Sequence, residues 1–210
     1  METPAILQAL ELTSWWEVPA VVLAILYLVL AARENIWCWA AGFASTAIYV
    51  YVFFDVKLFL ESALQIYYLV IAVYGWYQWR HPIDQSSTLP ISTWPLKKHC
   101  AVIAATSAIV VMSGYLLSEN TEAALPYVDA FTTWYAVVTT YMVAKKILEN
   151  WGYWFVIDSA LVYLSYSRGL YLTALLYVAY LVIIVFGYLK WKKEYDQQMS
   201  ELALEEELST

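Results

Sequence analysis

The chain has 210 residues, of which 62% are hydrophobic, 18% aromatic and only 14% charged. Because a soluble domain of ordinary composition is about 45–50% apolar, these values exclude one and predict an all-α integral membrane protein. The formal net charge is −7, and no basic patch with interleaved aromatic residues or metal-ligand spacing such as HExxH occurs, so we expect no nucleic-acid partner, metal or cofactor.

Seven apolar runs have about the length that crosses a bilayer as a helix. In chain order we expect transmembrane helices at residues 17–32, 37–54, 57–79, 99–117, 128–146, 150–167 and 169–190. The links between them are short except for residues 80–98, whose prolines and serines are typical of a loop. Residues 1–16 would form an extracytoplasmic N-terminus, and residues 192–210 an acidic cytoplasmic tail that is a solvated, frayed helix.

The distribution of Lys and Arg predicts the orientation. With the N-terminus outside, only Lys57 and Arg168 of the eleven basic residues lie on the outer side. The other nine are Arg33, Arg80, Lys97, Lys98, Lys145, Lys146, Lys190, Lys192 and Lys193. Short loops rich in Lys and Arg stay in the cytoplasm, so we expect a multi-pass protein of the bacterial inner (plasma) membrane whose C-terminus is cytoplasmic.

This orientation predicts where an impermeant thiol reagent can react. In a chain without its two native cysteines, Ser86→Cys and Ser200→Cys should both resist labelling in intact cells and react after permeabilisation. Labelling of either cysteine in intact cells would contradict the predicted orientation.

The two halves of the chain resemble each other, as "ENIWCWAAG…YGWYQW" (34–79) and "ENWGYWFVI…FGYLKW" (149–191) indicate. Matching pairs at a spacing of 112 are Tyr68 with Tyr180, Gly75 with Gly187, and Trp79 with Trp191. Trp39 is aligned with Trp154, which requires a three-residue gap in the loop after the first of these helices.

Two triplets of helices can point the same way across a membrane only if one further helix separates them. We therefore expect a 3+1+3 parallel repeat, with a first triplet at 17–79, a linker helix at 99–117 and a second triplet at 128–191. Parallel repeats are a transporter architecture in which the substrate binds at the repeat interface near the midplane of the membrane.

A carboxylate in the sixth expected helix marks the strongest candidate site. Trp151, Trp154 and Asp158 are spaced i, i+3 and i+7 and share one helical face. Asp158 would lie about 12 Å from the inner end of its helix, where a carboxylate costs about 2.5–3.5 kcal/mol. The alternatives are a structural hydrogen bond for Asp158 and an interfacial membrane anchor for Trp151.

Other helices carry polar or aromatic candidates. Glu61, Gln65 and Tyr68 share a face of the third helix, and Tyr177 lies on the corresponding face of the seventh. Secondary candidates are Trp39, Asp129, Thr132, Thr133 and Thr173. The alternative roles are interhelical hydrogen bonds for the threonines and core packing for the tyrosines.

Aromatic faces beside a carboxylate suit a flat cation. Such a ligand can stack on Trp and place its charge near the acid, while Gln65 reads an amide or amino edge. These residues predict a water-soluble, cationic, heteroaromatic substrate.

The segments "LESALQIYYLVIAVYGWYQW" and "DAFTTW…KKILENWGYWFVID…GLYLTALLY…GYLKW" resemble the PnuC-type vitamin transporters. The resemblance implies a full-length version of the SWEET-like fold. It also implies a homotrimer that takes up nicotinamide riboside by facilitated diffusion, with trapping through phosphorylation by a cytoplasmic kinase. Carried over residue by residue, the pocket would include Gln65, Trp151, Trp154 and the residue at 158.

Two carboxylates depart from the pattern of the family. Members similar to the enterobacterial nicotinamide riboside carriers tend to have Asn at the position of Asp158 and an apolar residue at that of Glu61. Thiamin, also a cation, is therefore the alternative substrate, and neutral riboflavin fits two acids less well. Remaining alternatives are a proton-coupled pump that uses Asp158 and Glu61, a membrane enzyme, which would need catalytic groups absent from the apolar runs, and a purely structural protein.

Overall fold

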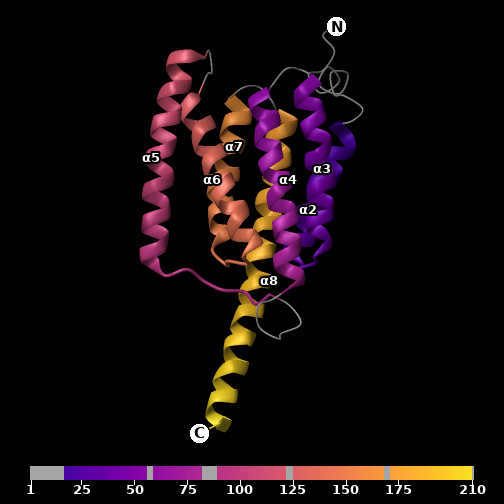
Figure 1. The fold of residues 1–210 in the computed structure, drawn as a ribbon, viewed down its shortest axis with the longest axis vertical. Helices are drawn as coiled ribbons and strands as arrows, with labels where there is room; N and C mark the ends of the chain where they lie inside the picture. The colour runs from indigo at the N-terminus through magenta and orange to yellow at the C-terminus, as the bar shows by residue number, and fades with distance from the viewer. Residues whose placement is uncertain (1–16, 56–58, 82–88, 122–124, 168–170, 210) are drawn as a thin grey trace. The chain divides into compact units, whose positions relative to one another are not determined.

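The computed structural model describes residues 17–55, 59–81, 89–121, 125–167 and 171–209. This part of the chain forms seven helices, α2 to α8 (Figure 1). They are α2 (Glu17–Ala32), α3 (Trp37–Asp55), α4 (Phe59–Arg80), α5 (Leu96–Asn120), α6 (Pro126–Ala144), α7 (Asn150–Ser167) and α8 (Tyr171–Ser209). The prediction of seven helices is confirmed, and every helix end except the last lies within three residues of its expected position. The expected N-terminal segment 1–16, Lys57, Arg168 and part of the 80–98 loop lie outside the described residues.

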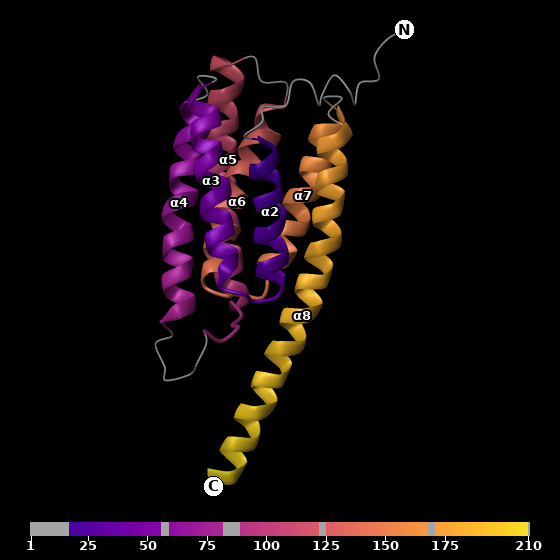
Figure 2. The same cartoon turned by 90° about the vertical axis from the view of Figure 1, so that its right-hand side faces the viewer.

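The last helix is longer than the apolar run that predicts it. α8 continues without a break through the acidic tail to Ser209, and it extends beyond α5, α6 and α7 in Figure 2. Lys192 pairs with Asp196 one turn later, and Ser200 donates to the Asp196 carbonyl at 2.8 Å. Such i, i+4 contacts stabilise an exposed helix, so the tail is helical although it buries little apolar surface.

Length and composition alone identify fewer spans than the seven expected. Among the described residues, Leu96–Asn120 and Thr173–Glu205 are long and apolar enough to cross a membrane, and Val18–Ala32 is a shorter apolar helix.

The chain divides into two compact units, residues 1–77 and 78–210. In the first, α2 packs along α3, and Ser45 donates a buried hydrogen bond to the Ala20 carbonyl at 2.8 Å. In the second, α5 packs on α6, α6 on α7, and α7 on α8. Val110, Ala130, Tyr135 and Ile157 form a buried cluster of α5, α6 and α7 in this second unit.

The same turn occurs once in each unit, 112 residues apart. Glu34 (φ 56°) and Lys146 (φ 49°) are the two positive-φ residues other than glycine in the described chain. Positive φ is uncommon for such residues, so its recurrence at this spacing is strong support for an internal repeat. The hydrogen bonds match as well, because Asn35 N donates to Leu30 O and Ile147 N to Met142 O, both at 2.9 Å.

The indole rings that follow these turns also correspond at a spacing of 112. Trp39 packs against Gly75, and Trp151 packs against Gly187. The alignment of Trp39 with Trp154 was therefore wrong, and the two halves match here without the three-residue gap. The division into parallel triplets around a linker helix remains a prediction.

The segment before α5 is fastened to the turn between α6 and α7. Ser92 N donates to Lys146 O at 3.0 Å, and Leu148 N donates to Ser92 O at 2.8 Å. Ile91 N also donates to Gln198 Oε1 of α8 at 3.2 Å. These bonds satisfy backbone groups at one end of the second unit.

Candidate functional site

Asp158 is a buried carboxylate on α7, with 4% of its surface exposed. No hydrogen bond or ion pair joins this carboxylate to any residue that the structure describes. An ionised group held away from water without a partner is expensive, which makes Asp158 unusual among the buried side chains.

Trp154 lies one turn before Asp158 on the same face of α7. Its indole is half-buried and packs against the cluster of Val110, Ala130, Tyr135 and Ile157. The ring is therefore anchored by packing and still partly accessible. α7 thus presents an anchored aromatic ring and a buried acid at the spacing that the sequence predicts.

The internal repeat separates the packing role from other roles on α7. At the spacing of 112, Trp154 and Asp158 correspond to Gly42 and Thr46 of α3. A Cβ at Gly42 would lie 2.9 Å from the Tyr27 ring, so this position could not hold an indole without a shift. Since the first unit builds the equivalent helix without either residue, the fold alone does not require a Trp and an Asp here.

Trp151, in contrast, repeats a packing arrangement. It is 2% exposed, a Cβ at Gly187 would lie 2.5 Å from its ring, and it meets Trp191 edge-on at 5.4 Å between centroids. Trp39 occupies the equivalent place against Gly75. Contact of Trp151 or Trp39 with a ligand stays a prediction, and the geometry of both rings favours packing between helices.

The remaining candidates of the second unit lie on α6 and α8. The hydroxyl of Thr132 is used within its own helix, 3.0 Å from Val128 O and 3.1 Å from Asp129 O. Asp129 lies in the first turn of α6, and Thr133 and Thr173 are half-buried. Tyr177 is half-buried with its ring edge-on to Tyr180 at 5.9 Å.

The candidates of the first unit lie on α4. Gln65 and Tyr68 are half-buried, and the Tyr68 ring lies 5.4 Å from that of Tyr67. Glu61 belongs to the second turn region of the same helix, but its side chain is outside the described part of the chain. Ligand contacts of all three residues stay predictions.

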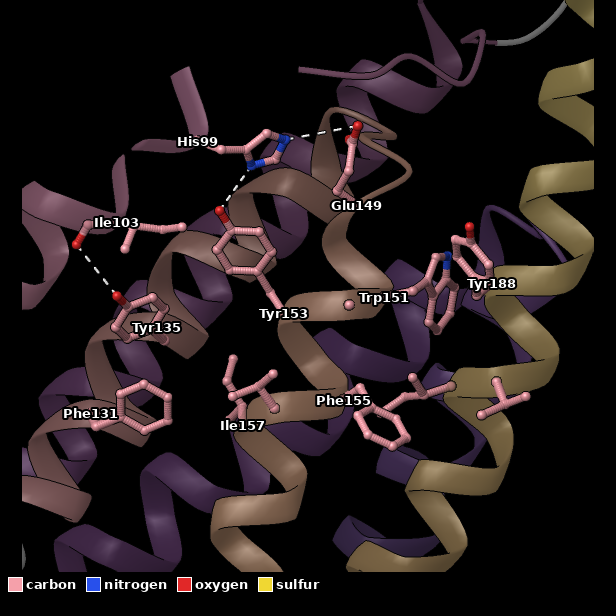
Figure 3. Close-up of a pocket in the computed structure, with 14 residues that line it drawn as sticks. His99, Ile103, Phe131, Tyr135, Glu149, Trp151, Tyr153, Phe155, Ile157 and Tyr188 are labelled. Atoms are coloured by element: carbon pink, nitrogen blue, oxygen red, sulfur yellow. Dashed lines mark hydrogen bonds and ion pairs between the residues drawn. The ribbon is translucent and has the colours of Figure 1, made fainter. Parts of the chain in front are cut away.

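A cavity of about 790 Å³ on the second unit has no counterpart in the predictions (Figure 3). We call it the lateral groove. Its fourteen lining residues are His99, Ile103, Phe131, Tyr135, Glu149, Trp151, Gly152, Tyr153, Phe155, Val156, Ile157, Ile184, Val185 and Tyr188. Neither Trp154 nor Asp158 is among them, so the groove is distinct from the predicted substrate face of α7.

A polar cluster closes one end of the lateral groove (Figure 3). His99 Nδ1 and Tyr153 OH are 2.9 Å apart, and His99 Nε2 lies 3.8 Å from Glu149 Oε1. His99 lies in the first turn of α5, near the start of the expected fourth helix. The i, i+4 spacing of Glu149 and Tyr153 is the one signal in the sequence that could have indicated this cluster.

Comparison with known proteins identifies the family. Residues 14–193 match the family described as nicotinamide mononucleotide transporter. The chain belongs to this family. A member of the nicotinamide mononucleotide transporter family is a multi-pass membrane transporter for a vitamin-type solute and not an enzyme, which confirms the resemblance to PnuC-type transporters.

Relatives within the family carry different names. The chain is 26% identical to the riboflavin/roseoflavin transporter RibM of Streptomyces davaonensis over 182 residues, which cover 84% of each chain. It is 23% identical to the nicotinamide riboside transporter PnuC of Escherichia coli over 203 residues, or 85% of each chain. Its fold matches a crystal structure of the vitamin B3 transporter PnuC with a TM-score of 0.69 and 25% identity, covering 92% of this chain and 87% of the other. The predicted all-helical fold is thus confirmed.

Proposed function

We propose that this protein carries a water-soluble cationic vitamin, nicotinamide riboside in the first place, across the bacterial plasma membrane by facilitated diffusion. The observation that carries the proposal is the buried carboxylate of Asp158, which has no partner among the described residues. Trp154 on the same face supplies an aromatic surface.

The charge of Asp158 is the reason to choose a cation. Burying a carboxylate is costly unless a counter-ion or hydrogen-bond donors accompany it. A pyridinium or thiazolium ring would bring its own positive charge to Asp158 while it stacks on Trp154. Gln65 would then distinguish the amide or amino edge of the ring, because it offers both donors and acceptors.

Two other vitamins remain as alternatives. Thiamin is a cation whose aminopyrimidine can pair with a carboxylate, so it satisfies Asp158 equally well. Riboflavin is favoured by the 26% identity to RibM, which is no lower than the identity to the nicotinamide riboside carriers. Its neutral ring, however, would leave the Asp158 carboxylate without a counter-charge.

The proposed mechanism is passive, with accumulation driven by a cytoplasmic kinase that phosphorylates the vitamin. In proteoliposomes without any kinase, we expect labelled nicotinamide riboside or thiamin to equilibrate in both directions. An imposed pH or sodium gradient should leave the final internal concentration equal to the external one.

A gradient-driven internal concentration well above the external one would contradict this mechanism. It would support a proton-coupled pump in which Asp158 and Glu61 relay protons. Liposomes without protein are the control for leakage.

We also propose, from the family resemblance, that the protein is a homotrimer, with its C-terminus in the cytoplasm. The nine basic residues on one side support the orientation. The mass of the purified protein without its detergent would distinguish a trimer from a monomer.

A further inference from the structure

The lateral groove combines an apolar floor with a polar end. Gly152, Phe155 and Val156 of α7 form the exposed floor, with α5 and α6 on one side and α8 on the other (Figure 3). A Cβ added at Gly152 would meet nothing within 4 Å, so the floor is open at this position. From Glu149 to Ile157 the groove follows about 12 Å of helix.

Apart from His99 and Glu149, the lining offers only apolar side chains, tyrosines, a tryptophan and a glycine. In a membrane transporter, an apolar channel of this kind on helices that cross the bilayer borders on lipid chains rather than on water. Its length suits part of an acyl chain, and its polar end lies where a headgroup would be.

Basic side chains stand next to the polar end. The first turn of α5 contains Lys97 and Lys98, both exposed, and no acidic residue. Lys98 Nζ lies 4.0 Å above the centre of the Trp94 ring, which keeps its ammonium near the surface of this end. On the other wall, Lys192 follows Tyr188 by one turn and pairs with Asp196.

Glu149 is the acidic residue of the groove, and its carboxylate is occupied. One oxygen lies 3.8 Å from His99 Nε2, and the other accepts the backbone N–H of Trp94 at 3.4 Å. The charge of Glu149 is thus directed toward the inside of the polar cluster, whereas Lys97 and Lys98 remain exposed beside it. The balance at this end favours an anion.

We propose that the lateral groove is a binding site for an anionic phospholipid. One acyl chain would lie over Gly152, Phe155 and Val156, and the phosphate would contact Lys97 and Lys98. The proposal concerns a surface that contains neither Trp154 nor Asp158, so it stands independently of the vitamin that is transported.

The test is native mass spectrometry of the full chain in detergent, titrated with phosphatidylglycerol or with phosphatidylcholine. Gly152→Leu fills the floor of the groove, and Lys97→Gln with Lys98→Gln removes the two charges. The matched controls are Val111→Leu, on an exposed face of α5 outside the groove, and Lys190→Gln with Lys193→Gln on α8. Thermal unfolding of each variant checks that it is folded.

Wild-type protein should retain phosphatidylglycerol in preference to phosphatidylcholine. Loss of the two lysines should weaken this binding roughly tenfold or more, since each basic residue near an anionic headgroup contributes about fivefold. Gly152→Leu should weaken binding of the same lipid by a similar factor, and both controls should bind like wild type.

Unchanged phosphatidylglycerol binding in the double lysine variant, or equal binding of the two lipids by wild type, would overturn the proposal. If Gly152→Leu does not fold, the lysine variant alone decides. A Gly152→Cys chain that forms a disulfide between two copies in the membrane would also overturn it, because a second copy would then cover the groove.

Discussion

Asp158→Asn protein is expected to bind a cationic vitamin about ten- to a hundred-fold more weakly than wild type. The substitution keeps the shape of the side chain but removes the charge and places a donor where an acceptor stood. A hydrogen bond to a charged group contributes about 1.5–3 kcal/mol, which corresponds to this range of affinity. Isothermal titration of the purified variant with thiamin and nicotinamide riboside measures the loss.

The pattern across ligands adds information about the substrate. If thiamin is the substrate, its binding should be lost, while nicotinamide riboside should be tolerated or even gained, because related nicotinamide riboside carriers tend to have Asn at this position. Binding of neutral riboflavin should not depend on the charge.

Asp196→Asn is the matched control for the charge, since it makes the same chemical change on the exposed part of α8 and should leave affinity unchanged. Unchanged affinity of folded Asp158→Asn protein for every cationic vitamin would make Asp158 a structural residue and remove it from the site.

Gly187→Ala should destabilise the second unit strongly for so small a change. The new Cβ would lie 2.5 Å from the ring of Trp151, which is itself packed edge-on against Trp191. Adding one methyl group to a closely packed interior costs about 1–3 kcal/mol. Thermal unfolding in detergent should therefore show a clearly lower midpoint, and Gly75→Ala should have the same effect through Trp39, 2.4 Å from its new Cβ.

The control for the glycine substitutions is Gly152→Ala. This residue lies in α7 with open space at its Cβ, so the substitution should be neutral or slightly stabilising through helix propensity. Equal midpoints for Gly187→Ala and Gly152→Ala would contradict the packing role of Trp151 and restore its indole as a candidate for ligand stacking.

The helices could be predicted because their apolar runs end where the chain turns polar. α7 matches the expected residues 150–167 at both ends. The same rule failed for α8, because hydropathy marks the end of an apolar run and not the end of a helix. Beyond Trp191 the tail contains no Gly or Pro, and pairs such as Lys192 with Asp196 continue the helix outside the apolar region.

The register of the repeat could not be obtained reliably from the residues alone. Trp154 attracted the alignment with Trp39 because both follow an Asn near the start of a helix. The turns that fix the register have positive φ at Glu34 and Lys146, and neither is a Gly that would have announced such a backbone. Only the structure shows that Trp151 has the partner of the repeated type, Gly187.

The candidate site was predictable in part. Helical spacing placed Trp154 and Asp158 on one face of α7, but a spacing cannot tell whether a carboxylate finds a partner. The lateral groove was missed because four helices contribute to its walls, from His99 to Tyr188, and no local pattern joins them.

The central claim, that the substrate is a cationic vitamin, is tested most directly by titrating purified wild-type protein with nicotinamide riboside, thiamin and riboflavin under identical conditions. The account predicts saturable binding of at least one of the two cations and a weaker affinity for riboflavin, because only a cation supplies a counter-charge for Asp158. Tight binding of riboflavin together with no binding of either cation would contradict it.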